Sequence, residues 1–156
     1  MKRLQIYLDT NTIYGFVKEI VKARIEGRDF IKPRKIRFLQ NNFDKIEPFT
    51  SFFSSMEIIE NLEKELKMGR NRLKNAISLF KKISGVKILN HMSLTGETYK
   101  WFLSGTGLKD AIQVNIAKNK NLVFVSEDKK LVRKIKQFYK DSLTLKELKQ
   151  IIKIIK

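Results

Sequence analysis

The sequence LQIYLDTN, residues 4–11, decides how the rest of this chain is interpreted. Its apolar residues predict a buried first strand that ends at Asp9, and residues 12–23 then carry apolar side chains at helical spacing. A first strand with a carboxylate at its carboxyl end is typical of an open α/β sheet, which binds ligands at that edge. The triplet Asp9-Thr10-Asn11 is equally suited to cap the helix that follows. The residues alone leave both roles open for Asp9.

Predicted strands and helices alternate along the whole chain. After the first strand and helix, we expect further strands over residues 49–53, 86–89 and 122–125. We expect helices over residues 34–43, 56–68, 70–83, 96–103, 108–118 and 129–139, and a C-terminal amphipathic helix capped by Thr144. Ser54 and Ser55 are the predicted caps of the helix 56–68, and Gly69 ends it. The alternation predicts one α/β domain over residues 1–156, with a central parallel sheet flanked by helices in three layers.

The chain is strongly basic. It contains 33 Lys and Arg against 16 Asp and Glu, a formal net charge of +17. Such an excess attracts polyanions, with nucleic acid as the first candidate and an anionic membrane surface as the second. A lysine-rich surface of the kind that thermophiles use is the simpler alternative.

The residue types also exclude several kinds of site. Because there is no cysteine, disulfides and thiolate metal sites are excluded, and a metal would need oxygen ligands or His91. His91 is the only histidine, and we assign it no role. No apolar run approaches the ~20 residues that span a bilayer, and the chain starts without a signal-peptide-like segment. We therefore expect a cytoplasmic enzyme or nucleic-acid-binding protein without a membrane partner.

The most basic part of the chain is an arm at residues 24–42. Its cations alternate with apolar and aromatic residues, a mixture typical of surfaces that contact both phosphates and bases. The predicted RNA-binding residues are Arg24, Arg28, Lys32, Arg34, Lys35 and Arg37. In the alternative interpretation, Phe30, Ile36 and Phe38 attach the arm to the core and the charges are simply solvated.

Four acids occupy comparable places in the predicted fold. Asp9 and Asp128 follow strands, whereas Glu57 and Asp110 are expected in the first turns of helices. Because the carboxyl ends of adjacent parallel strands meet at one edge of a sheet, we expect the four acids to face one pocket. Glu60 is an alternative to Glu57, and both also suit the positive end of a helix dipole.

Several carboxylates in one place repel each other and are tolerated when a hard divalent cation neutralises them. Mg²⁺ and Mn²⁺ prefer oxygen ligands and retained waters. Such an ion binds a scissile phosphate and activates a water molecule for in-line attack. An acidic pocket in a basic protein therefore indicates hydrolysis of phosphodiester bonds.

With these motifs the chain resembles the PIN-domain ribonucleases, the family that includes the VapC-type toxins of toxin–antitoxin pairs. The matching pieces run nearly end to end: the first strand with Asp9-Thr10-Asn11, the Thr50-Ser51 element that leads to Glu57, Asp110-Ala111-Ile112 at the start of a helix, and the turn Ser126-Glu127-Asp128. Ser126 stands where the family commonly has threonine, and Glu127 is an additional acid.

The resemblance implies a PIN-like fold and an Mg²⁺- or Mn²⁺-dependent endoribonuclease, either a toxin or an RNA-processing nuclease. The metal-binding and catalytic acids would be Asp9, Glu57, Asp110 and Asp128, with Glu60 and Glu127 as alternatives. Thr10, Asn11 and Ser126 would orient carboxylates or water through hydrogen bonds. The resemblance also implies RNA as the substrate, an antitoxin protein as a candidate partner, and a homodimer.

Two other functions stay open on the residues alone. One is a non-catalytic RNA-binding or protein-interaction module that retains the PIN fold. The other is an aspartate-based phosphotransfer enzyme, because Asp9 follows a first strand. Haloacid-dehalogenase-like phosphatases have a second aspartate two residues later, where this chain has Asn11, and this disfavours that option.

Overall fold

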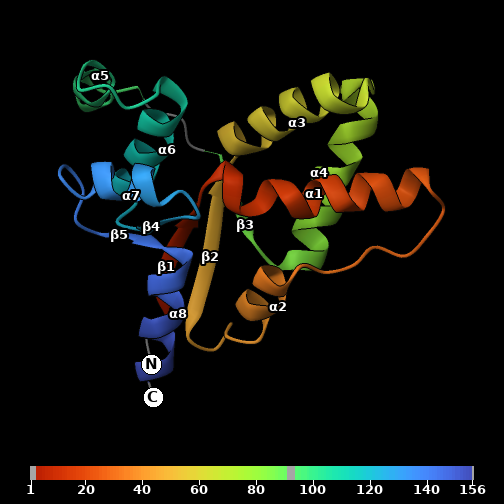
Figure 1. Ribbon diagram of the computed structural model, residues 1–156, viewed down its shortest axis with the longest axis horizontal. Coiled ribbons are helices and arrows are strands. Elements are labelled where there is room, and N and C mark those ends of the chain that lie inside the picture. The colour runs from red at the N-terminus through yellow and green to blue at the C-terminus, as the bar shows by residue number, and fades with distance from the viewer. Residues whose placement is uncertain (1–2, 91–93, 156) are drawn as a thin grey trace.

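The computed structural model describes residues 3–90 and 94–155, and these residues contain one five-stranded parallel sheet. The strands are β1 (Leu4–Leu8), β2 (Ile46–Ser51), β3 (Lys87–Leu89), β4 (Val123–Ser126) and β5 (Ser142–Thr144). Their order is β3-β2-β1-β4-β5, so β1 is the central strand with β2 and β4 as its neighbours (Figure 1). His91 lies outside the described residues.

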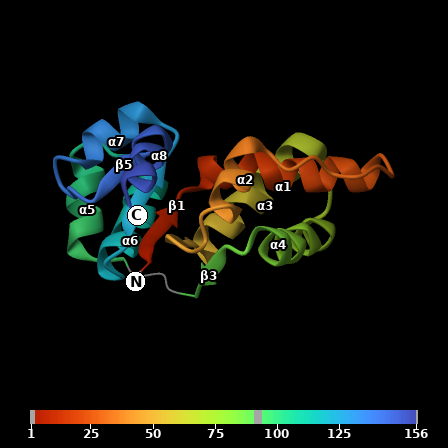
Figure 2. The same cartoon turned by 90° about the horizontal axis from the view of Figure 1, so that it is seen from below.

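Helices cover both faces of the sheet, which confirms the three-layer α/β arrangement. They are α1 (Thr10–Ile25), α2 (Arg34–Gln40), α3 (Phe52–Leu66), α4 (Arg70–Ser84), α5 (Gly96–Leu103), α6 (Leu108–Asn119), α7 (Lys129–Ile135) and α8 (Leu145–Ile154). Ile6 and Leu8 of β1 face a core formed with α1, α2, α3, α4 and α8. Tyr7 faces a second core formed with α5, α6 and α7. Figure 2 shows α1 to α4 on one side of β1 and α5 to α7 on the other.

The burial of β1 on both faces explains its sequence. Ile6, Tyr7 and Leu8 are each 0% exposed, because a parallel sheet between two helix layers buries consecutive residues rather than alternate ones. The register aligns Leu8 with Val125 of β4, and Tyr7 with Phe49 of β2. The residues that follow these three strands therefore lie side by side at one edge of the sheet.

The predicted boundary between the second strand and its helix is wrong. The sequence predicts a strand over residues 49–53 and a helix capped by Ser54 or Ser55. In the structure β2 ends at Ser51, and Phe52 is already the first residue of α3. Ser54 and Ser55 are buried inside the helix.

A contact between distant residues explains this earlier start. Ser51 is the N-cap, since its Oγ accepts a hydrogen bond from the Ser54 backbone N at 3.1 Å. The same oxygen lies 2.7 Å from the hydroxyl of Tyr7 on the neighbouring strand, a contact that no local pattern reveals. As a result Glu57 lies in the second turn of α3 and not in the first.

The end of α3 also differs from the prediction. The helix ends at Leu66, and Lys67 after it adopts a left-handed conformation with φ of 51°. Gly69, predicted to end α3, is instead the N-cap of α4. A non-glycine residue thus makes the turn that glycine usually makes.

The fifth strand is a feature that the sequence did not predict. One helix was expected over residues 129–139, but α7 ends at Ile135 and the chain then forms β5. The Tyr139 hydroxyl donates a hydrogen bond to the Leu122 carbonyl at 2.7 Å, and Ser142 Oγ donates one to the Tyr139 carbonyl at 2.8 Å. These contacts fix the turn, and a strand of three residues is too short to show a periodic pattern.

The C-terminal helix α8 is capped as predicted. Thr144 Oγ1 accepts a hydrogen bond from the Glu147 backbone N at 3.1 Å, and Glu147 accepts one from the Thr144 backbone N at 2.6 Å. This reciprocal pair is a capping box, and the buried Leu145, Leu148 and Ile152 attach the helix to the first core. Within the described ranges, none of the helices is both long and apolar enough to cross a membrane.

Removing this cap should destabilise the protein measurably. We expect Thr144→Ala to lower the free energy of unfolding by about 1 kcal/mol, because the first turn of α8 loses a hydrogen-bond acceptor. Thr144→Ser keeps the hydroxyl and should cost much less. Urea denaturation followed by circular dichroism measures both variants. If both variants lost the same free energy of unfolding, the stabilisation would come from the threonine methyl group and not from the cap.

Candidate functional site

Asp9 is buried at the end of β1, with 3% of its surface exposed. Its Oδ1 accepts hydrogen bonds from the backbone N of Thr12 at 2.9 Å and from Thr12 Oγ1 at 2.5 Å, and Oδ2 accepts one from Ser126 Oγ at 2.6 Å. Asp9 is therefore the N-cap of α1. Burial raises the pKa of Asp9, although the hydrogen bonds from Ser126 and Thr12 oppose this shift. The carboxylate is thus held in one orientation by its own helix and by the neighbouring strand.

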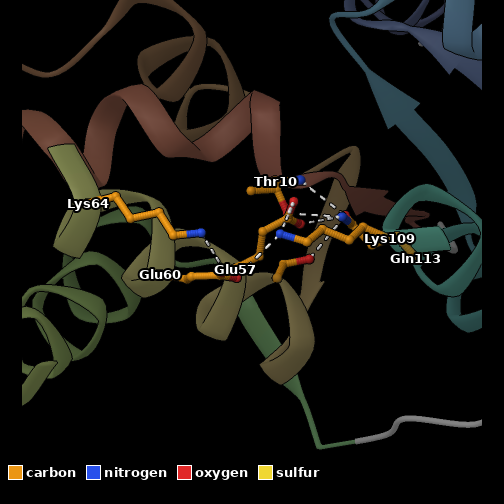
Figure 3. Close-up of polar contacts among 7 residues, drawn as sticks. Thr10, Glu57, Glu60, Lys64, Lys109 and Gln113 are labelled. Atoms are coloured by element: carbon orange, nitrogen blue, oxygen red, sulfur yellow. Dashed lines mark hydrogen bonds and ion pairs between the residues drawn. The ribbon is translucent and has the colours of Figure 1, made fainter. Parts of the chain in front are cut away.

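Glu57 of α3 is tied to the residue after Asp9 (Figure 3). Its Oε2 accepts hydrogen bonds from Thr10 Oγ1 at 2.7 Å and from Gln113 Nε2 at 2.9 Å. The Gln113 Oε1 in turn accepts a hydrogen bond from the Thr10 backbone N at 3.1 Å. The starts of α1, α3 and α6 therefore meet in one hydrogen-bond network.

Gln113 was not predicted, although it connects all three helices. It is 2% exposed, and its Oε1 also accepts a hydrogen bond from Ser54 Oγ at 3.1 Å. The available signal was its spacing, because residues three apart share one face of a helix and Gln113 follows Asp110 by three positions. A polar side chain on the buried face of a helix needs hydrogen-bond partners, and Gln113 finds them in Thr10, Ser54 and Glu57.

Asp110 stands in the first turn of α6, as predicted. Burial, followed by the negative charges of Glu57, Asp9 and Asp128, raises the pKa of Asp110 to about 6, and Lys134 opposes the shift. The other three predicted acids thus act electrostatically on Asp110. Unlike the other three, Asp110 accepts no hydrogen bond from the described residues.

The turn after β4 connects Asp128 to Asp9. Asp128 donates its backbone N–H to Ser126 Oγ at 3.0 Å, and the same hydroxyl donates to Asp9. The Asp128 carboxylate accepts two backbone N–H groups from the first turn of α7, at 2.8 and 3.0 Å. Glu127 is exposed and pairs with Lys35 of α2 at 2.7 Å. Asp128 is therefore a helix cap as well as a candidate ligand.

Lys109 of α6 is a cation beside the acids that the sequence analysis did not identify (Figure 3). Its Nζ lies 3.3 Å from Glu60 Oε2 and 3.7 Å from Glu57 Oε1. Glu60 also pairs with Lys64 at 2.7 Å, and these two lysines lower the pKa of Glu60. Glu57 is thus the helix acid that contacts the network around Asp9, whereas Glu60 lies on its outer side.

The donor chemistry of this site suits a hard divalent cation. The side chains that meet here offer carboxylate, hydroxyl and amide oxygens, and the Asp110 carboxylate has no hydrogen-bond donor in the described part of the chain. In residues 3–90 and 94–155, however, no three acids stand close enough to hold one ion in this arrangement. Carboxylates that are now directed at hydroxyl, amide and lysine groups would have to turn toward a shared ion. Asn11, another predicted neighbour, is exposed.

The basic arm exposes most of its charges and also Ile25 and Ile31, which are 60% and 72% exposed, whereas Phe30, Ile36 and Phe38 pack inward. Phe30 packs edge-on against Phe16 with ring centroids 6.0 Å apart, Ile36 is 0% exposed, and Phe38 packs against the first core. Arg28 is paired with Glu19 and Glu26. Phe30, Ile36 and Phe38 therefore attach the arm to the core, as the alternative interpretation expects. Of the predicted RNA-binding residues, all but half-buried Lys35 are exposed, and their role stays a prediction: Arg24, Arg28, Lys32, Arg34, Lys35 and Arg37.

Two solved structures share this architecture over almost the whole chain. PAE2754 from Pyrobaculum aerophilum is 19% identical, with 97% of this chain and 96% of that chain covered and a TM-score of 0.58. VapBC-1 from nontypeable Haemophilus influenzae is 18% identical, with 92% and 99% covered and a TM-score of 0.55. No protein-family model and no curated protein matches the chain. At these identities the likeness concerns the fold.

Asp110 gives the folded protein a characteristic pH dependence. Because its pKa rises from 3.8 to about 6, the folded state binds the proton more tightly than the unfolded chain. Its contribution to stability is therefore complete below about pH 4 and is lost as the pH rises through about 6. In a buffer with chelator, Asp110→Asn should raise the free energy of unfolding near pH 7 by about 1 to 2 kcal/mol, after allowance for solvent screening.

The measurement is urea denaturation of both proteins between about pH 4 and 7.5, in steps. The gain in the free energy of unfolding should shrink toward pH 4, where the Asp110 carboxyl of the parent is increasingly protonated in both the folded and the unfolded state. Asp44→Asn, at an exposed acid before β2, serves as the control and should show no such trend. A variant at Asp110 that is less stable than the parent near pH 7 would contradict the repulsion described above.

Proposed function

We propose that this chain, which has the PIN/VapC-like fold, is a divalent-metal-dependent endoribonuclease that hydrolyses RNA phosphodiester bonds at the carboxyl edge of its sheet. One observation carries the proposal: hydrogen bonds link acids from separate elements at this edge, because Ser126 Oγ connects Asp9 with Asp128 and Gln113 connects the residue after Asp9 with Glu57. Like charges gathered at a cost in stability are typical of functional sites. The basic surface supports an anionic substrate.

The proposed ligands for Mg²⁺ or Mn²⁺ are Asp9, Glu57, Asp110 and Asp128. When bound, the ion would neutralise the acids, polarise the scissile phosphate and lower the pKa of a water molecule. Ser126 holds one oxygen of Asp9 in place through its 2.6 Å hydrogen bond. Thr10 and Gln113 do the same for Glu57 through hydrogen bonds to its Oε2.

The likeness to VapBC-1 extends the proposal to a biological role. In that role the chain is the toxin of a toxin–antitoxin pair, acts as a homodimer, and is inhibited by an antitoxin protein. An RNA-processing nuclease without an antitoxin is the other form of the same proposal. Coexpression with the product of a neighbouring reading frame, followed by purification, separates these two roles.

A second candidate function is a non-catalytic RNA-binding or protein-interaction module. The observation that favours it is Lys109, whose Nζ lies 3.3 Å from Glu60 and 3.7 Å from Glu57. This lysine balances part of the acidic charge without a metal ion. RNA binding that persists without any cleavage in Mn²⁺ would favour the module.

Cleavage of a labelled single-stranded RNA tests the proposed activity. The protein should cleave in Mn²⁺ or Mg²⁺ and not in EDTA. Asp9→Asn should reduce the rate by at least about 100-fold, since even groups that merely orient metal ligands are typically worth 10- to 100-fold. Asparagine also caps helices well, so the start of α1 should persist.

Asp44→Asn removes an exposed acid away from the site and should leave the rate unchanged. Cleavage that survives EDTA, or that is equal in Asp9→Asn and the parent, would refute a metal-dependent mechanism at this edge.

Metal binding offers a second test that does not need a substrate. Because Lys109 faces Glu57, its charge repels a divalent cation at the acids. We expect Lys109→Met to bind Mn²⁺ about two- to fivefold more tightly, the range that corresponds to an exposed charge pair. Lys64→Met, whose lysine pairs only with the outer acid Glu60, should bind Mn²⁺ as the parent does. Titration calorimetry or Mn²⁺ electron paramagnetic resonance measures both, and weaker binding in Lys109→Met would be the contrary result.

A further inference from the structure

A groove runs between α3 and α4 and ends at the acid site. The two helices pack side by side (Figure 1). The cavity between them has a volume of ≈ 790 Å³, and Glu57, Glu60 and Lys109 form part of its lining. Its apolar lining includes Ile59 of α3 and Ile77 of α4. The groove therefore reaches Glu57, one of the acids of the proposed site.

Two large apolar side chains line this groove while remaining open to solvent. Phe52 is 56% exposed and Met56 is 43% exposed, and they lie one turn apart on α3. Phe53 also lines the groove, although it is half-buried and packs against the second core. An exposed aromatic ring and a flexible thioether beside a cavity form a surface on which a planar base can stack.

The opposite wall of the groove is cationic. Lys74 and Lys81 of α4 line it, and both are exposed. Neither forms an ion pair with an acid of the described residues, whereas Arg70 at the end of the groove pairs with Glu63 at 2.8 Å. Residues seven apart share one face of a helix, so the two lysines lie along the groove about 10 Å apart along the helix axis.

We propose that this groove binds the segment of single-stranded RNA next to the cleaved phosphate, with a base against Phe52 and Met56 and the backbone phosphates at Lys74 and Lys81. This inference rests on the proposed nuclease function, because the RNA in the groove is the part of the substrate that adjoins the phosphate cleaved at the acids. The strand is single because only unpaired bases offer a free face for stacking.

The groove suits this role better than the basic arm does. The aromatic residues of the arm, Phe30 and Phe38, pack against the core, so the arm offers cations and the exposed Ile25 and Ile31 but no exposed aromatic ring. In the groove, Lys74 and Lys81, which pair with no acid of the described residues, occur together with the exposed ring of Phe52, beside Glu57 and Glu60. Charge without a stacking surface binds nucleic acid without selecting single strands.

Fluorescence anisotropy with a labelled single-stranded 12-nucleotide RNA, measured in EDTA to prevent cleavage, tests the proposal. Phe52→Ala should weaken binding by at least about fivefold and leave the affinity for a duplex of the same length unchanged. Lys74→Gln/Lys81→Gln should reduce the slope of log affinity against log salt by about 1.4, since each lost phosphate contact on a single strand removes about 0.7.

The matched control is Lys82→Gln/Lys120→Gln, which removes the same charge at two exposed lysines that do not line the groove. This control should keep the parent slope and affinity within about twofold. If the groove variants behave like the control, the strand does not bind here and the proposal is overturned, even if metal-dependent cleavage is observed. A loss in the groove variants alone supports it, even if no cleavage is found.

Discussion

The parallel pairing of β1 with β2 on one side and β4 on the other is the constraint on which the rest of the structure depends. The ladder continues past the end of the strand, because the Asp9 backbone N donates to the Val125 carbonyl at 3.1 Å. On the other side Thr50 Oγ1 donates to the Leu8 carbonyl at 3.0 Å. The backbone that carries Asp9 is thus fixed by both neighbouring strands. Asp9 and the turn that carries Asp128 lie side by side, linked through Ser126, because β1 and β4 end at the same edge.

Gathering those carboxylates opposes folding, and the protein compensates only in part. Hydrogen bonds from Ser126 and Thr12 stabilise the charge on Asp9, and Lys109 stabilises Glu57 from the solvent side. Asp110 receives no comparable hydrogen bond within the described residues, and its pKa is raised to about 6. Because the negative charge at Asp110 is only partly compensated, this edge of the sheet attracts cations electrostatically.

The sequence predicts those parts of the site that depend on strand ends and helix starts. The positions of Asp9 and Asp110 follow from an apolar run that stops at an acid and from an acid in the first turn of a periodic helix. The start of α3 at Phe52 and the strand β5 do not follow, because contacts from Tyr7 and Tyr139 to residues far away in the sequence decide them. Gln113 and Lys109 were missed for a related reason: only the packing of α6 against α3 shows what they face.

The most direct test of the central claim, that acids from separate elements share one divalent cation, is anomalous diffraction from crystals grown with Mn²⁺. We predict one strong peak at the carboxyl edge of the sheet, within about 2.2 Å of oxygens of both Asp9 and Asp110, with Lys109 turned away from Glu57. A peak only at unrelated surface acids would contradict the claim. So would a site that stays without Mn²⁺ while Lys109 keeps its contact with Glu57.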